Sequence, residues 1–205
     1  MSPSRARWHT RDVMLVVVLG VVFGFLYWVL VQAWVALSVA AGPFGDLTQH
    51  VLLGGWLIVA PLAVAITRRP GSGIVAEVVA SVIEVVFLGS PVGPLLLVAA
   101  FLQGLGSELP FALTRYRRFG WGVFALSGAL GAFAVFWFSA LRAGWFGQDV
   151  IVLRLVLQVV SGIVLGGLLA RVVVESLRRT GVLDGFAIVR EERRVAGGAP
   201  EPARG

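Results

Sequence analysis

Cysteine is absent from this chain of 205 residues, and the only histidines are His9 and His50. The lack of cysteine excludes disulfides, thiolate metal sites, iron–sulfur clusters and cysteine nucleophiles. The two histidines are far apart in the sequence and flank apolar runs, so they do not predict a histidine-based metal site or proton relay. From these absences we expect neither a metal site nor a cofactor.

Charge is scarce as well. Charged residues make up 14% of the chain, whereas about 25% is usual in soluble domains, and apolar residues make up 58% instead of about 45–50%. The mean hydropathy is +0.91, and the apolar residues are gathered into runs as long as a bilayer is thick. The composition therefore excludes a soluble enzyme and predicts an all-α, integral membrane helix bundle.

Catalytic motifs are missing too. The chain contains no G-x-x-x-x-G-K-[ST] phosphate loop, no H-E-x-x-H and no G-x-S-x-G. Ser127 and Ser161 each precede a glycine, but we expect no histidine within a membrane span to activate them. The sequence therefore predicts a protein that is not an enzyme and has no catalytic residues.

Apolar stretches separated by glycine, proline or arginine predict six membrane helices. Their ranges are 13–39, 51–67, 74–88, 92–114, 119–141 and 150–174. The arginines before the first stretch are typical of a signal peptide, but the stretch is far longer than the about 7–15 apolar residues of such a peptide. We therefore expect an uncleaved first span.

All seventeen basic residues are arginine, and the net charge is +6. On a soluble protein this excess would suggest nucleic acid, but here the arginines flank the spans and we expect no nucleic-acid partner. Six spans place fifteen arginines on one side of the bilayer and only Arg142 and Arg154 on the other. Because cytoplasmic loops retain arginine, we predict that both termini are cytoplasmic. The predicted organisation is a cytoplasmic segment over 1–12, a membrane domain over 13–177 and a disordered cytoplasmic tail over 178–205.

The third and fourth predicted spans carry three carboxylates, Glu77, Glu84 and Glu108, and the fourth also carries the amide of Gln103. Intramembrane charge is costly and is a functional candidate by default. Seven residues fall 20° short of two helical turns, so Glu77 and Glu84 point to nearly one face, about 10 Å apart along the axis. Arginines are within reach of Glu77 and Glu108, so both are equally well explained as structural. No arginine lies on the stretch that carries Glu84, which favours a ligand-binding role for it.

Tryptophans provide a second candidate group. Trp28 and Gln32 are four residues apart on the first span, Trp34 lies further along it, and Trp56 lies on the second span. With Glu84 they are suited to an aromatic box for a flat, cationic ring. The alternative is that they belong to the interfacial belt of membrane tryptophans.

Small residues at four-residue spacing allow helices to approach closely. Gly20 and Gly24 form such a stripe on the first span, and the last span carries Gly162, Gly166 and Ala170. We expect the stripe on the last span to pack within the bundle. The stripe on the first span is a candidate docking face for another protein.

Several blocks of this sequence are distinctive: WHTRDV (8–13), GVVFG (20–24), APLA (60–63), RRPG (68–71), the pair Glu77 and Glu84, QGLGSELPF (103–111) and RYR (115–117). Together these blocks resemble the YkoE family, whose members are substrate-binding S components of energy-coupling factor vitamin importers. The block at 103–111 is the most specific, and the resemblance covers about residues 8–177.

The resemblance implies a six-helix subunit in the bacterial plasma membrane that captures thiamine or its hydroxymethylpyrimidine precursor from outside. It also implies two kinds of partner, a transmembrane coupling subunit and a pair of cytoplasmic ATPases, which explains the missing phosphate loop. In S components small residues on the first helix dock the coupling subunit, and Gly20 and Gly24 match that role.

Thiamine suits the candidate residues, because its aminopyrimidine can hydrogen-bond to a carboxylate and its thiazolium is a cation that suits aromatic faces. We assign Glu84 to the amine or cation, Gln103 and Gln32 to the polar edge of the ring, and stacking to Trp28, Trp34 and Trp56. Two alternatives stay open. One is a self-contained, proton-coupled secondary transporter of a small cation, with Glu77, Glu84 and Glu108 as a proton relay. The other is a structural subunit without a ligand.

Overall fold

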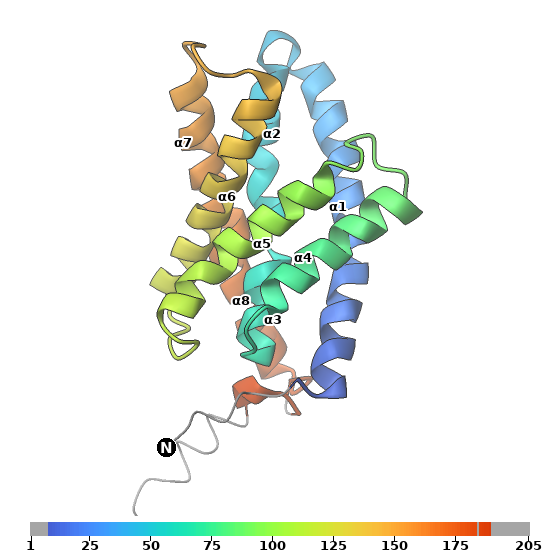
Figure 1. Cartoon of the computed structure of the whole chain (residues 1–205), viewed down its shortest axis with the longest axis vertical. Helices are drawn as coiled ribbons and strands as arrows, with labels where there is room; N and C mark the ends of the chain where they lie inside the picture. The colour runs from blue at the N-terminus through green and yellow to red at the C-terminus, as the bar shows by residue number, and fades with distance from the viewer. Residues whose placement is uncertain (1–7, 184, 190–205) are drawn as a thin grey trace, which may run out of the picture.

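The computed structural model describes residues 8–183 and 185–189, and in these residues the fold is helical with no strand. Among them, five segments are long and apolar enough to cross a membrane. The five are Thr10–Ala40, Gly42–Thr67, Leu96–Leu113, Trp121–Ala143 and Ile151–Arg179. Figure 1 shows them as an elongated bundle, so the expected all-α membrane fold is confirmed.

The first helix, α1 (Thr10–Ala40), runs along one side of the bundle from end to end (Figure 1). The second segment is broken into a 3-10 turn η1 (Gly42–Phe44), α2 (Gly45–Leu52), a second 3-10 turn η2 (Leu53–Leu57) and α3 (Val59–Thr67). Every residue of α3 is buried, as is usual for a helix that is apolar on all sides. His50 lies inside this segment and is fully buried, which corrects the expectation that it flanks a span.

The next two helices cross the bundle obliquely (Figure 1). They are α4 (Ser72–Val82), which continues into a π-helical turn η3 (Ile83–Phe87), and α5 (Leu96–Leu113). The sequence predicts a span at 74–88, and this stretch is helical. However, α4 and η3 have only 11 and 5 residues, fewer than the about 20 that an upright spanning helix needs. It is therefore not among the five candidate spans.

The last part of the bundle is formed by α6 (Trp121–Ala143), α7 (Ile151–Ser161), a π-helical segment η4 (Gly162–Leu168) and α8 (Leu169–Arg179). Its small residues allow close contacts between backbones. A Cβ at Gly162 would lie 2.6 Å from the Cβ of Ala132 on α6, and one at Gly166 would lie 2.9 Å from the Cβ of Leu57. Ala170 is also fully buried. The expected internal packing of this stripe is confirmed.

Gly20 and Gly24 are buried against α4, in the interior of the chain. A Cβ at Gly20 would lie 2.5 Å from Cγ1 of Val79, and one at Gly24 would lie 2.6 Å from the carbonyl oxygen of Ala80. The expectation that these glycines dock a partner protein is therefore wrong for this structure, because α4 of the same chain already covers them. Glycine is needed here for the close approach of two helices.

The beginning of the predicted tail is folded onto the bundle. The helix α8 continues to Arg179, and beyond it Leu183 and Ile188 are buried in the main hydrophobic cluster. The side chain of Arg11 donates a hydrogen bond of 2.8 Å to the carbonyl oxygen of Gly185. The prediction of disorder from residue 178 is thus wrong for residues 178–183 and 185–189, and the rest of the predicted tail, 184 and 190–205, lies outside the described residues.

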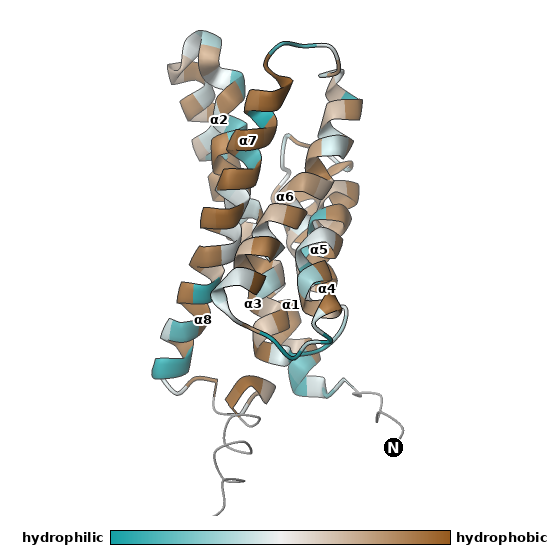
Figure 2. Ribbon diagram, turned by 90° about the vertical axis from the view of Figure 1, so that its left-hand side faces the viewer, coloured by the Kyte–Doolittle hydropathy of each residue, from teal (hydrophilic) through white to brown (hydrophobic). Residues whose placement is uncertain are grey.

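Hydropathy is distributed as expected for a membrane protein. Figure 2 shows apolar residues along the helices and hydrophilic residues gathered at the lower end and in the loop at the upper end. Large apolar side chains are exposed along several helices, for example Phe25 on α1 and Phe133 on α6. These exposed side chains suit contact with lipid.

Candidate ligand-binding site

A cavity of about 80 Å³ opens toward the upper end of the bundle, where α1 ends. We call it the inner cavity. Residues of α1, α2, η2, η3, α5 and α6 line it, and its aromatic and polar side chains include Trp34, Gln49, Trp56, Glu84, Gln103 and Arg142. A wider depression of about 500 Å³, which we call the vestibule, shares five of the inner cavity's lining residues. The two spaces therefore form one hollow that leads from the upper end into the bundle.

Glu84 provides the buried charge of the inner cavity. It lies on η3, and only 1% of the residue is exposed. Its Oε1 accepts a hydrogen bond of 2.8 Å from the hydroxyl of Ser90, whereas its Oε2 is buried without a hydrogen-bond partner among the described residues. A buried carboxylate oxygen without a donor is unfavourable. A ligand with an N–H group would satisfy it.

Three other predicted residues line the same cavity. Trp56 on η2 and Gln103 on α5 are buried, and Trp34 on α1 is half-buried. The indole Nε1 of Trp34 is buried without a hydrogen-bond partner among the described residues. The structure thus brings an acceptor, two aromatic rings and an amide together from four parts of the chain.

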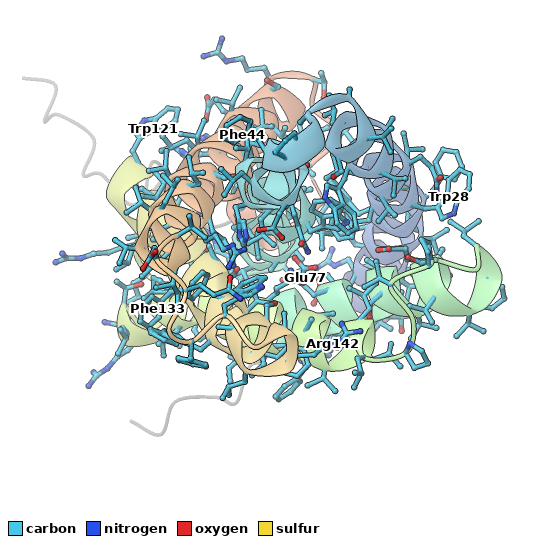
Figure 3. The ribbon with its side chains drawn as sticks, turned by 90° about the horizontal axis from the view of Figure 1, so that it is seen from above. Trp28, Phe44, Glu77, Trp121, Phe133 and Arg142 are labelled. Carbon is cyan, nitrogen blue, oxygen red and sulfur yellow. The ribbon has the colours of Figure 1, made fainter. Side chains whose placement is uncertain are left out.

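Trp28 and Gln32 do not line this cavity. Trp28 lies on the outer side of α1, as Figure 3 shows, and it stacks on Phe25 with ring centroids 6.3 Å apart. Gln32 is exposed. Both residues therefore lie outside the site that the geometry supports.

Glu77 is buried deep in the bundle, close to its centre in Figure 3. The hydroxyl of Tyr27 donates to Oε1 of Glu77 at 3.4 Å and accepts a hydrogen bond of 3.2 Å from the backbone N–H of Val59. Glu77 and Glu84 are both buried, as expected for two residues on one face, but only Glu84 lines the inner cavity. Glu77 connects α1, α3 and α4.

Glu108 accepts hydrogen bonds around the start of α4. The donors are the backbone N–H groups of Gly71, of Gly73 at 3.0 Å and of Ile74 at 3.2 Å, and the hydroxyl of Tyr116 at 2.7 Å. Burial, together with the nearby Glu108 carboxylate, raises the pKa of Tyr116 above its usual value, so Tyr116 remains a donor at neutral pH. Glu108 therefore holds the first turn of α4 against α5, and it does not line the inner cavity.

Three polar lining residues were not predicted as ligand contacts: Gln49, Ser139 and Arg142. Sequence reasoning used Arg142 only as a charge on the arginine-poor side. A signal was present, because Val135, Phe138, Ser139 and Arg142 recur at helical spacing and all line the inner cavity. This spacing marks one face of α6.

Comparisons with known proteins agree with this architecture. Residues 11–134 match a family model described as "ABC-type cobalt transport system, permease component". The YkoE protein of Bacillus subtilis (strain 168), named as an HMP/thiamine permease, is 32% identical over 198 residues, which are 96% of this chain and 98% of that protein.

A solved structure is also similar. The crystal structure of an S-component of an ECF transporter superposes with a TM-score of 0.84 at 30% identity, covering 96% of this chain and 100% of the other. Sequence and fold thus agree over nearly the full length of both relatives. This chain belongs to the YkoE family and is the substrate-binding S component of an energy-coupling factor importer of the bacterial plasma membrane.

Proposed function

We propose that the inner cavity binds thiamine or its hydroxymethylpyrimidine precursor. The observation that carries the proposal is the free Oε2 of Glu84, buried in a cavity that Trp34 and Trp56 also line. The amine of an aminopyrimidine is a donor for this oxygen, and the flat ring suits stacking on indoles. The name of the Bacillus subtilis relative supports the same ligand class.

The volumes of the inner cavity and the vestibule support a pose in which one part of the ligand lies in each. One water needs about 10–15 Å³ of such space, so the inner cavity of about 80 Å³ holds several waters, comparable to one substituted six-membered ring. The larger vestibule has room for the rest of the ligand. In the proposed pose the pyrimidine lies inside and its substituent points outward.

The cobalt in the description of the family model suggests a second ligand class, a metal ion. Metal ions are held by several His, Cys, Asp or Glu side chains. Within the residues that the structure describes, no three of these side chains come together in such a group. This observation favours an organic ligand.

The proposed topology has six membrane helices, with α4 and η3 forming the third and both termini in the cytoplasm. Fifteen of the seventeen arginines then lie on the cytoplasmic side, which the retention of arginine in cytoplasmic loops supports. The two exceptions, Arg142 and Arg154, lie near the upper end of the bundle, and Arg142 lines the vestibule. The hollow therefore opens to the outside of the cell.

The proposed partners are a transmembrane coupling subunit and two cytoplasmic ATPase subunits. The support is that this chain is an S component and that its sequence carries no phosphate-binding loop. In this assembly the chain captures the vitamin and its partners supply the energy for import.

The test is a titration of the purified protein in detergent with thiamine, followed by tryptophan fluorescence. The hydroxymethylpyrimidine and riboflavin serve as competitors. We expect saturable quenching that the pyrimidine reverses and riboflavin does not, because Trp34 and Trp56 line the site. If neither thiamine nor the pyrimidine changes the fluorescence or competes, the proposed ligand is wrong.

A further inference from the structure

The hollow carries opposite charges at its two ends. Glu84 lies in the inner cavity, and Arg142, near the end of α6, lines both the inner cavity and the vestibule. Arg142 forms no hydrogen bond, ion pair or ring contact with any other residue that the structure describes, and it is exposed. Figure 3 shows it at the end of the bundle onto which the view looks down. Its guanidinium is therefore free to bind a ligand.

The other arginine at this end is already occupied. Arg154 forms an ion pair of 2.7 Å with Asp46 and stacks on Trp145 at 5.0 Å. The remaining acidic residue of this end, Asp149, is exposed and does not line the vestibule. Since no carboxylate lines the vestibule, the charge of Arg142 is not neutralised there.

We propose that Arg142 is the anchor of an anion subsite that binds a phosphate ester of the vitamin. The inference rests on the function proposed above and extends it to the monophosphates of thiamine and of the hydroxymethylpyrimidine. A guanidinium presents a fork of N–H donors that matches phosphate oxygens. Gln49 and Ser139, which line both spaces with Arg142, supply further donors.

The position of the subsite fits the chemistry of these esters. With the aminopyrimidine at Glu84, the substituent that carries the hydroxyl extends toward the vestibule, and this hydroxyl is the group that is esterified. Thiamine without phosphate brings its cationic thiazolium toward an unpaired guanidinium, and two like charges repel. A phosphate on the same ligand reverses the sign of this interaction.

Binding of four ligands by the purified protein tests the inference: thiamine, the hydroxymethylpyrimidine and the monophosphate of each. We expect each ester to bind at least about tenfold more tightly than its parent, which equals about 1.4 kcal/mol. Raising the salt from about 50 to about 500 mM should reduce this preference, because exposed charges are screened. If the parent vitamins bind and their esters bind no more tightly, the inference is wrong and the proposed function stands.

The variant Arg142→Gln identifies the anchor. We expect the affinity ratio of ester to parent to fall close to one in this variant. The matched control is Arg117→Gln, which removes one exposed arginine at the opposite end of the bundle and should keep the ratio of the unchanged protein. A ratio that persists in Arg142→Gln refutes the role of Arg142. If no parent vitamin binds at all, the proposed function fails first, and the inference fails with it.

Discussion

The hydroxyl of Ser90 donates a hydrogen bond of 2.8 Å to Oε1 of Glu84. The backbone N–H of Ser90 also donates to the carbonyl oxygen of Glu84, at 3.0 Å. Ser90 follows the π-helical turn that carries Glu84, so the chain folds back on this residue and fixes one carboxylate oxygen. The other oxygen remains free for a ligand. The short loop at Ser90 therefore fixes the position of the Glu84 carboxylate and leaves its Oε2 available to a ligand.

The variant Glu84→Gln replaces a carboxylate by an amide of nearly the same shape. We expect thiamine affinity to fall at least about tenfold, or about 1.4 kcal/mol, because a charge-assisted hydrogen bond is lost. Isothermal titration calorimetry of the purified protein measures this change. The control is Glu175→Gln on α8, far from the cavity and paired with arginines. Equal affinities for Glu84→Gln and the unchanged protein would remove Glu84 from the site.

The two cavity tryptophans should behave differently from Trp28. Replacing Trp56 by Phe should weaken thiamine binding by only part of the about 0.5–1.5 kcal/mol of an aromatic pair, because Phe keeps a smaller ring, and should reduce the fluorescence quenching on saturation. Trp28→Phe should change neither quantity, because Trp28 lies outside the lining. Fluorescence titrations of both variants make the comparison. The assignment is wrong if Trp28→Phe abolishes the quenching and Trp56→Phe does not.

Glu108→Gln should lower stability rather than binding. Three backbone N–H groups and the hydroxyl of Tyr116 donate to this carboxylate, and hydrogen bonds to a charged group contribute about 1.5–3 kcal/mol. We expect a lower midpoint of thermal unfolding, with thiamine affinity retained by the folded protein. Glu175→Gln should shift the midpoint less, since exposed ion pairs contribute about 0–1 kcal/mol. Equal shifts in the two variants would contradict the capping role.

Gly24→Ala tests the contact between α1 and α4. The added Cβ would lie 2.6 Å from the carbonyl oxygen of Ala80, so the helices must separate, and overpacking of this kind costs about 1–3 kcal/mol. We expect a lower unfolding midpoint. Gly122→Ala on α6 is the control, because nothing lies within 4 Å of its added Cβ. If Gly24→Ala unfolds at the temperature of the unchanged protein, α4 does not cover Gly24.

The sequence predicts the class of fold well, because long apolar runs have few other solutions. It also singles out Glu84, since an intramembrane carboxylate without a nearby arginine needs a partner. It does not show which face of α1 points inward. That helix is apolar on nearly every side, so no polarity contrast distinguishes its lipid-facing side from its buried side.

Two errors follow from this lack of contrast. The spacing of Trp28 and Gln32 places them on one face but does not show that this face points away from the cavity. The spacing of Gly20 and Gly24 likewise indicates a close contact without naming the partner, which is α4. Arg142 was missed for another reason, because an arginine at the end of a span is equally well explained by membrane orientation.

The hydrogen bonds of Glu108 also constrain how the hollow can open. Glu108 ties the start of α4 to α5 at the lower end, while the loop between η3 and α5 connects the two helices at the upper end. Glu84 and Gln103 thus lie on two helices that are joined to each other at both ends, an arrangement that we call the α4–α5 frame. These two side chains can move apart in two ways. Either the hydrogen bonds of Glu108 break, or the helix bends at η3, because π-helical turns are sites where helices kink. A ligand therefore enters and leaves more easily when α1, α6 or the loop between η3 and α5 moves than when α4 and α5 separate.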